Sequence, residues 1–93
     1  MSIKPWFTYI VRCTDGALYI GVTTDLHERI SAHNSGKGSK SCRAHGLPVR
    51  LMWSLRVVDK SAALKIECEL KKLTKVEKER MIGMTISQSG DLE

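Results

Sequence analysis

The chain has 93 residues, of which 42% are hydrophobic and 27% are charged, and 15 Lys and Arg against 10 Asp and Glu give a formal net charge of +5. This is the composition of an ordinary folded domain, and the length allows one hydrophobic core but no second domain or large cofactor cavity. No apolar stretch reaches the roughly 20 residues of a membrane span, and residues 1–5 lack a secretory apolar run. We therefore expect a cytoplasmic protein without a membrane partner, and the positive charge favours a polyanionic one.

The start of the chain predicts a β-hairpin. Trp6–Arg12 is rich in aromatic and β-branched residues, which favours a strand, and Leu18–Thr23 is the expected returning strand. Asp15-Gly16 between them is a strong turn signal.

A helix and a polar loop are expected next. Thr24 or Asp25 can cap a helix that runs from about residue 25 to 34 and stops at Gly36. Residues 35–45 are polar, basic and glycine-bearing, which predicts a loop.

The middle of the chain predicts a third strand over residues 48–58, followed by a helix. Asp59 or Ser61 caps this helix, which runs to about residue 73. Its apolar side chains recur at helical spacing, at Ala63, Ile66, Leu70 and Leu73.

The last helix is predicted from the capping-box pattern Thr74-Lys-Val-Glu77 and is expected to end at Gly83. Residues 84–93 are polar and are expected to be a flexible tail. The whole chain, 1–93, then forms a single α/β (α+β) domain with its core in about residues 5–83. The element order β-β-α-β-α-α predicts a three-stranded, mainly antiparallel sheet flanked by helices.

The three cysteines, Cys13, Cys42 and Cys68, have no paired spacing and are expected to be free thiols, two of them in the core. Cys42-x-x-His45 resembles half of a zinc site, but the chain offers no second half. A plain loop cysteine and histidine are therefore the favoured interpretation.

Helical spacing brings some polar side chains together. Arg29 and His33 are i,i+4 neighbours and present a guanidinium and an imidazole on one face, although spacing alone favours a histidine at the core edge and a surface arginine. On the second helix Glu67 and Glu69 flank the apolar stripe on opposite sides, and Glu67 is expected to be the more buried. Each can be a ligand or a surface residue.

The polar loop carries Lys37, Lys40 and Arg43, which can bind a nucleic-acid backbone or belong to a solvated loop. Its glycines lack the spacing of a nucleoside triphosphate site, which we exclude.

The predicted hairpin contains two tripeptides, Phe7-Thr8-Tyr9 and Tyr19-Ile20-Gly21, whose tyrosines are ten residues apart. After them come Thr23-Thr24-Asp25-Leu26, Arg29, His33-Asn34, Gly36-Lys37-Gly38 and Ala63-Leu64-Lys65-Ile66-Glu67 with Leu70-Lys71. In this order the motifs resemble the GIY-YIG nuclease superfamily over about residues 6–80. The chain looks closest to its small stand-alone bacterial members, and is more distantly similar to the nuclease module of the excision-repair protein UvrC and to homing endonucleases.

The resemblance implies an endonuclease that hydrolyses DNA phosphodiester bonds with a single Mg²⁺ or Mn²⁺ ion. The expected substrate is branched or single-stranded DNA, in repair or recombination, with a protein partner for targeting. By position, Tyr9 and Tyr19 would be the site tyrosines, Arg29 the phosphate-binding arginine, His33 its companion and Glu67 the metal ligand. Either a tyrosine hydroxyl or His33 would take the proton from the attacking water.

The sequence departs from the family pattern at three places. Phe7-Thr8 replaces Gly-Ile, Val22 stands where some repair members have lysine, and no asparagine follows Asn34. A nucleic-acid-binding module without turnover is therefore an alternative, as is a protein-interaction adaptor that uses Trp6, Trp53 or the basic last helix.

Strand geometry offers a test of a shared site. A two-residue turn at Asp15-Gly16 would put Tyr9 and Tyr19 on opposite faces of the sheet, whereas a three- or five-residue loop puts them on one face. We predict the odd-length loop.

Overall fold

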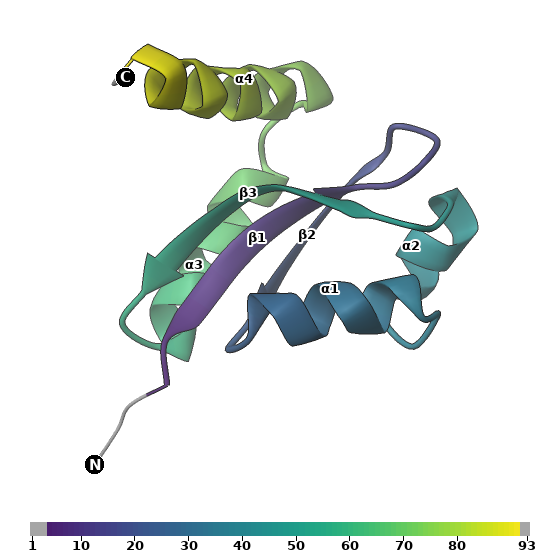
Figure 1. The fold of residues 1–93 in the computed structure, drawn as a ribbon. Coiled ribbons are helices and arrows are strands. Elements are labelled where there is room, and N and C mark those ends of the chain that lie inside the picture. The colour runs from purple at the N-terminus through teal and green to yellow at the C-terminus, as the bar shows by residue number, and fades with distance from the viewer. Residues whose placement is uncertain (1–3, 92–93) are drawn as a thin grey trace.

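The computed structural model describes the backbone of residues 4–91 and the side chains of residues 4–83. Its elements are β1 (Trp6–Arg12), β2 (Leu18–Thr23), α1 (Leu26–Asn34), α2 (Lys40–His45), β3 (Arg50–Val57), α3 (Lys60–Lys71) and α4 (Lys75–Asp91). The strands form one sheet in the order β2-β1-β3, and both pairings are antiparallel (Figure 1). The predicted three-stranded α+β architecture is confirmed.

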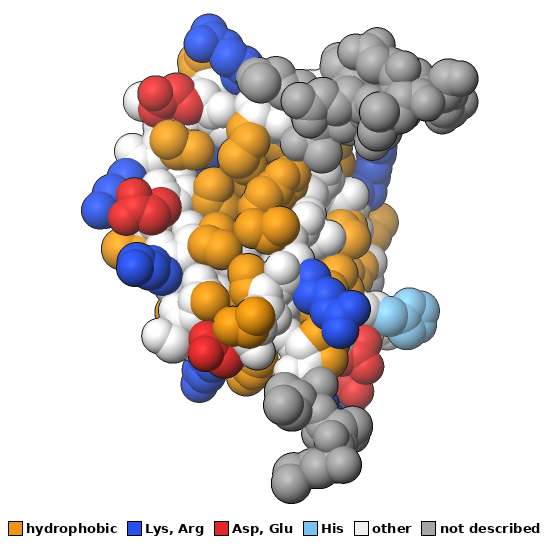
Figure 2. Space-filling view, turned by 90° about the vertical axis from the view of Figure 1, so that its left-hand side faces the viewer, with side chains coloured by type: hydrophobic (Ala, Val, Ile, Leu, Met, Phe, Trp, Pro, Cys, Tyr) orange, Lys and Arg blue, Asp and Glu red, His pale blue; other side chains and the backbone are white. Residues whose placement is uncertain are grey.

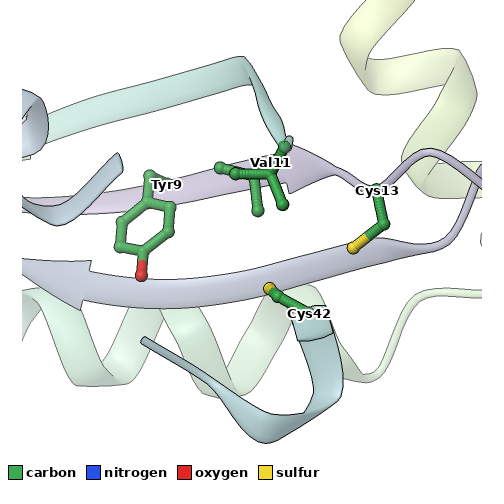
Figure 3. Close-up of a cluster of buried hydrophobic side chains, with 5 residues drawn as sticks. Tyr9, Val11, Cys13 and Cys42 are labelled. Atoms are coloured by element: carbon green, nitrogen blue, oxygen red, sulfur yellow. The ribbon is translucent and has the colours of Figure 1, made fainter. Parts of the chain in front are cut away.

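The central strand β1 is covered on both faces, which divides the interior into two layers. Tyr9, Val11 and Cys13 point to one face and pack with Cys42 of α2 and with side chains of α1 (Figure 3). Ile10 points to the other face, where it packs with side chains of β2, α3 and α4. Successive side chains of a strand alternate in this way because the backbone is pleated.

The register of the hairpin puts both tyrosines on one face. Tyr19 lies opposite Val11, and Tyr9 lies opposite Gly21. Five residues, 13–17, therefore connect the paired strands, and their turn includes Gly16 at a φ of +93°. The prediction of an odd-length loop is confirmed.

The segment expected to be a loop, residues 35–45, contains the short helix α2, so the prediction was wrong for residues 40–45. The side chain of Ser39 caps this helix by accepting hydrogen bonds from the amides of Ser41 and Cys42. Cys42 is buried against side chains of β1 and anchors α2 to the sheet. One buried cysteine in six polar or small residues leaves no recognisable apolar period, which is why the sequence pattern missed the helix.

Helix α4 begins at the predicted capping box. The Thr74 amide donates to the Glu77 carboxylate at 2.8 Å, and the Glu77 amide donates to Thr74 Oγ1 at 3.1 Å. The helix continues to Asp91, so the expected end at Gly83 was wrong. A glycine inside a helix costs only about 1 kcal/mol, and Gly83 does not adopt the positive φ that ends a helix. The expected flexibility of residues 84–93 stays a prediction.

An ion pair fixes α4 against the hairpin. Arg12 donates two hydrogen bonds to the carboxylate of Glu79, at 2.7 and 2.5 Å, and one to the carbonyl oxygen of Gly16 at 3.3 Å. Lys75 Nζ donates to the same carbonyl at 2.9 Å. The Gly16 carbonyl of the hairpin loop therefore accepts hydrogen bonds from one cation of β1 and one cation of α4.

Figure 2 shows a face of the molecule with hydrophobic side chains at its centre and charged side chains around them. The large apolar residues that stay exposed are Leu51, Leu55, Val58, Leu64 and Val76. Two of them belong to β3, an edge strand that also carries exposed Arg50 and Arg56, and such charges oppose edge-to-edge pairing. No helix within residues 4–91 has the length and apolar character needed to cross a bilayer.

Candidate active site

Four of the five predicted catalytic residues meet on one face of the sheet. Tyr9 comes from β1, Tyr19 from β2, and Arg29 and His33 from successive turns of α1. The ring centroids of Tyr9 and Tyr19 are 6.5 Å apart, and the His33 ring lies 6.0 Å from Tyr9 and 5.4 Å from Tyr19, edge-on to both. The structure thus forms the cluster from segments far apart in the sequence.

Hydrogen bonds centre on the Tyr9 hydroxyl. Arg29 Nε donates to Tyr9 Oη at 3.2 Å, and His33 Nε2 lies 3.0 Å from the same oxygen. Arg29 and His33 reach one atom from the same helix because residues four apart lie on one helical face. The i,i+4 pairing expected from the sequence therefore occurs.

The four side chains differ in access to solvent. Tyr9 is 0% and His33 is 1% exposed, whereas Tyr19 and Arg29 are only partly buried. A ligand can therefore reach Tyr19 and Arg29 first. Tyr9 and His33 form the layer beneath them.

Burial and charge shift the protonation equilibria in this layer. Burial raises the pKa of Tyr9 above its ordinary value of 10.0, although the hydrogen bond from Arg29 opposes the shift. Burial and the nearby Arg29 cation both lower the pKa of His33 from 6.5. At neutral pH the cluster therefore holds a protonated phenol, a neutral imidazole and a guanidinium whose pKa the Tyr9 hydrogen bond raises further.

Hydrogen bonds at both ends of α1 fix the orientation of this helix relative to the sheet. Asp25 caps the helix, with its carboxylate accepting from the Glu28 amide at 3.0 Å, while the Asp25 amide donates to Thr23 Oγ1 at 3.1 Å. At the other end the side-chain oxygen of Asn34 accepts from the Val49 amide at 2.6 Å. Both ends of the helix are thus fixed relative to the strands.

Two residues at the site were not singled out as functional from the sequence. Gly38 packs so closely on His33 that a β-carbon there would overlap the imidazole. The backbone amide of Ser39 donates to His33 Nδ1 at 3.4 Å. The only sequence signal for Gly38 was the Gly36-Lys37-Gly38 motif. The Ser39 amide gave no signal, because almost every residue type has a backbone N–H.

The fifth predicted residue, Glu67, lies apart from the other four. It is on α3, which packs against β1 and β2 on the Thr8 and Ile10 face, opposite to α1. Its side chain is 19% exposed, against 66% for Glu69, so Glu67 is the more buried carboxylate, as expected. Within the described residues its charged partner is Lys71, at 3.3 Å, and no hydrogen bond joins it to the tyrosines, Arg29 or His33.

Glu67 meets the minimum requirement for a divalent ion. A carboxylate oxygen is a hard ligand that suits Mg²⁺ or Mn²⁺, and Mg²⁺ is often held by one or two carboxylates, with waters and substrate phosphates completing its shell. Among residues 4–83 no group of three His, Cys, Asp or Glu side chains could enclose a metal. The chain thus fits an ion held by one carboxylate and does not form a closed cage.

The predicted basic residues, Lys37, Lys40 and Arg43, are all exposed on the segment that follows α1. Arg43 Nη1 also donates to the Gly36 carbonyl at 2.8 Å, which fixes its side chain across the segment. This places positive charge next to the helix that carries Arg29 and His33.

The cysteines are free thiols, with Cys13 and Cys42 buried and Cys68 exposed, as expected. Burial, and then the neighbouring Cys13, raise the pKa of Cys42 to about 11 (Figure 3). Its thiol is therefore protonated at neutral pH and is a poor nucleophile. His45, the other half of the Cys-x-x-His motif, instead contacts the Asp15 carboxylate at 2.6 Å.

Comparison with known proteins shows the family of the chain. Residues 5–80 match the family described as the GIY-YIG catalytic domain, and the chain belongs to this family. Its more similar relatives are bacterial proteins of the UPF0213 group. A UPF0213 protein of Vibrio cholerae is 51% identical over 81 residues, 86% of this chain and 79% of the relative. The UPF0213 protein YhbQ of Escherichia coli is 46% identical over 81 residues, 87% of this chain and 80% of the relative.

Two solution structures share the fold. The UPF0213 protein BH0048 of Bacillus halodurans is 39% identical, with a TM-score of 0.55 over 86% of this chain and 84% of that one. The protein EF2693 of E. faecalis is 34% identical, with a TM-score of 0.59 over 98% of this chain and 91% of that one. The resemblance seen in the sequence to small bacterial members of the family is thus confirmed.

Proposed function

We propose that this protein is a divalent-metal-dependent endonuclease that hydrolyses DNA phosphodiester bonds. The observation that carries the proposal is the meeting of Tyr9, Tyr19, Arg29 and His33 on one face of the sheet, in a chain whose residues 5–80 match a catalytic domain. A phosphodiester is an anion whose transition state gathers further charge on the phosphoryl oxygens. The partly exposed guanidinium of Arg29 and the partly exposed Tyr19 suit this chemistry.

The partly exposed pair, Arg29 and Tyr19, would contact the substrate. Arg29 donates to Tyr9 through Nε and its guanidinium also interacts with Tyr19, and its terminal N–H groups would donate to non-bridging phosphate oxygens. Tyr19 presents its hydroxyl beside them and is the candidate to accept a proton from the attacking water. The buried pair, Tyr9 and His33, would hold Arg29 in place.

Glu67 would hold the divalent ion, with waters and phosphate oxygens as the remaining ligands. Its support is the family resemblance and its low exposure compared with Glu69 on the same helix. Because α3 packs on the face of the sheet opposite to α1, the phosphate held by Arg29 would have to meet this ion at the edge strand β2, which carries Tyr19 and contacts α3. When bound, such an ion neutralises charge on the phosphoryl oxygens and on the leaving alkoxide.

Lys37, Lys40 and Arg43 would contact the DNA backbone on either side of the scissile bond. Contacts to phosphates are independent of base sequence, so the substrate would be chosen by its shape. This supports branched or single-stranded DNA, as formed in repair or recombination, as the substrate class.

The test is a cleavage panel with branched, single-stranded and duplex DNA, and a matched RNA, in Mg²⁺ and in Mn²⁺. The wild-type protein is compared with Glu67→Ala and with the control Glu69→Ala, which removes an exposed carboxylate from the same helix. We expect cleavage by the wild type and by Glu69→Ala, and a loss of at least about 100-fold in Glu67→Ala.

Unchanged cleavage by Glu67→Ala would contradict the metal assignment. Salt-sensitive DNA binding without cleavage in any metal would favour the alternative of a binding module without turnover. Stronger cleavage of the RNA would reassign the substrate.

A further inference from the structure

The resting state of His33 can be deduced from its two ring nitrogens. The Ser39 amide hydrogen points at Nδ1, with an N–N distance of 3.4 Å. A nitrogen that accepts a hydrogen bond carries no proton, so the proton of the neutral ring must be on Nε2. Nε2 lies 3.0 Å from Tyr9 Oη and therefore donates to it.

The position of the Ser39 amide depends on Gly38. A β-carbon at residue 38 would overlap Nδ1 and lie 2.9 Å from both Cγ and Cα of His33. Real β-carbons essentially never approach other atoms so closely, and here one neighbour is backbone and the other belongs to a fully buried ring. Only glycine lets the chain pass across the imidazole and present the next amide to it.

We propose that Gly38 and the backbone amide of Ser39 are positioning groups that hold His33 as the Nε2-protonated neutral tautomer, so that His33 donates to Tyr9 instead of accepting a proton from the substrate side. Tyr9 Oη then accepts from His33 Nε2 and from Arg29 Nε. With both lone pairs engaged, the phenol oxygen fixes the Arg29 side chain of α1 against β1. A histidine held in this tautomer cannot take the proton from the attacking water through Nε2, so Tyr19 is left as the proton acceptor. This consequence for catalysis rests on the proposed function.

The backbone at Ser39 permits a direct test. Its φ of −77° lies within the range of proline, and the preceding glycine has no β-carbon to clash with the ring. Ser39→Pro therefore removes the amide hydrogen. Ser39→Ala keeps this hydrogen but loses the hydroxyl that caps α2, so it is the matched control.

The readout is the protonation pattern of the His33 ring nitrogens in ¹⁵N NMR at pH 7.5. We expect the Nε2-protonated tautomer in the wild type and in Ser39→Ala, and a mixture of tautomers in Ser39→Pro. A wild-type ring protonated on Nδ1, or equal patterns in Ser39→Pro and Ser39→Ala, would overturn the inference. The wild-type spectrum decides the tautomer even if a variant fails to fold.

A second pair of variants tests the glycine. Gly38→Ala should disturb the tautomer, whereas Gly83→Ala, where an added β-carbon meets nothing within 4 Å, should leave it unchanged. If the wild type cleaves DNA, Ser39→Pro should cleave 10- to 100-fold more slowly than Ser39→Ala, because misplacing a supporting group has a cost of this order. A shifted tautomer in a protein that never cleaves would refute the proposed function and leave the positioning of His33 intact.

Discussion

Gly21 lies directly opposite Tyr9 in the β1–β2 ladder, and a β-carbon at Gly21 would lie 2.5 Å from the Tyr9 hydroxyl oxygen. The tyrosine side chain therefore crosses the neighbouring strand at the one position that has no side chain. Its hydroxyl reaches Arg29 and His33 on α1 by this route. The glycine of the second tripeptide thus has a steric role in placing the tyrosine of the first.

We expect Gly21→Ala to destabilise the protein and to displace the Tyr9 hydroxyl. Tyr9 is fully buried and cannot move aside freely, so the overlap should cost about 1–3 kcal/mol in the free energy of unfolding. Urea denaturation measures this cost. The control Gly83→Ala adds the same methyl group to an open helical position and should be neutral or stabilise by up to about 1 kcal/mol. Equal effects of the two substitutions would show that Gly21 does not act through Tyr9.

His33 should make stability depend on pH below neutrality. Its folded pKa is lowered from 6.5 by burial and by Arg29, so the unfolded chain binds more protons as the pH falls through this range. The free energy of unfolding should thus decrease from about pH 6.5 downward until the folded pKa is passed. Denaturation of the wild type and of His33→Gln between pH 7.5 and 5 measures this.

The His33→Gln variant should lack this part of the pH dependence. The control His27→Gln changes an exposed histidine on the same helix and should keep it. A slope that is the same in all three proteins would contradict a neutral, buried His33.

The ion pair between Arg12 and Glu79 predicts a second loss of stability, at lower pH than that of His33. The hydrogen bonds from Arg12 lower the pKa of Glu79 below its ordinary value of 4.5. The pair therefore stabilises the fold above about pH 4.5, and this contribution is lost as the pH falls through the lower folded pKa. Since both side chains are partly exposed, we expect Glu79→Gln to cost about 1 kcal/mol at pH 7.

That cost should shrink as the pH falls through the lowered folded pKa of Glu79, because the protonated glutamic acid is then neutral like the glutamine. Glu69→Gln is the control, because Glu69 is 66% exposed and its pair with Lys72 has an N–O distance of 3.4 Å. An equal cost for Glu79→Gln at pH 7 and at pH 2 would show that the ion pair does not stabilise α4.

The basic segment after α1 should determine the salt dependence of DNA binding. The double substitution of Lys37 and Lys40 by alanine removes two exposed cations next to the site. The slope of log K against log salt should fall by roughly 1.8 for duplex DNA, about 0.9 for each lost phosphate contact. Titrations between 50 and 200 mM salt measure it. The control Lys72→Ala, on the far side of the sheet, should leave the slope unchanged. If Lys72→Ala lowered the slope as much as the double substitution, the assigned DNA-binding surface would be wrong.

The sequence predicted the hairpin well because its signals are local. β-branched and aromatic residues defined both strands, and a shared face for Tyr9 and Tyr19 required an odd-length loop, which the five-residue connection confirms. It also predicted the more buried carboxylate of α3, since the apolar stripe at Ala63, Ile66 and Leu70 fixes which side of the helix faces the sheet. The sequence did not predict helix α2, because a single buried cysteine gives no periodic apolar signal. It also did not predict that α4 continues past Gly83, because a glycine inside a helix has only a small cost in stability.

By itself, the sequence predicted the architecture, because strand alternation and helical spacing are properties of the local backbone, and its resemblance to the GIY-YIG family singled out the residues of the candidate site. Only the tertiary structure decided which of those residues are buried, which are partly exposed, and on which face of the sheet each one lies. It buried Tyr9 and His33, left Arg29 and Tyr19 partly open, and set Glu67 on the opposite face of the sheet. The burial of Tyr9 and His33 arises from packing of β1 against α1 and α2, which are distant from β1 in the chain, and packing of this kind has no local sequence signature.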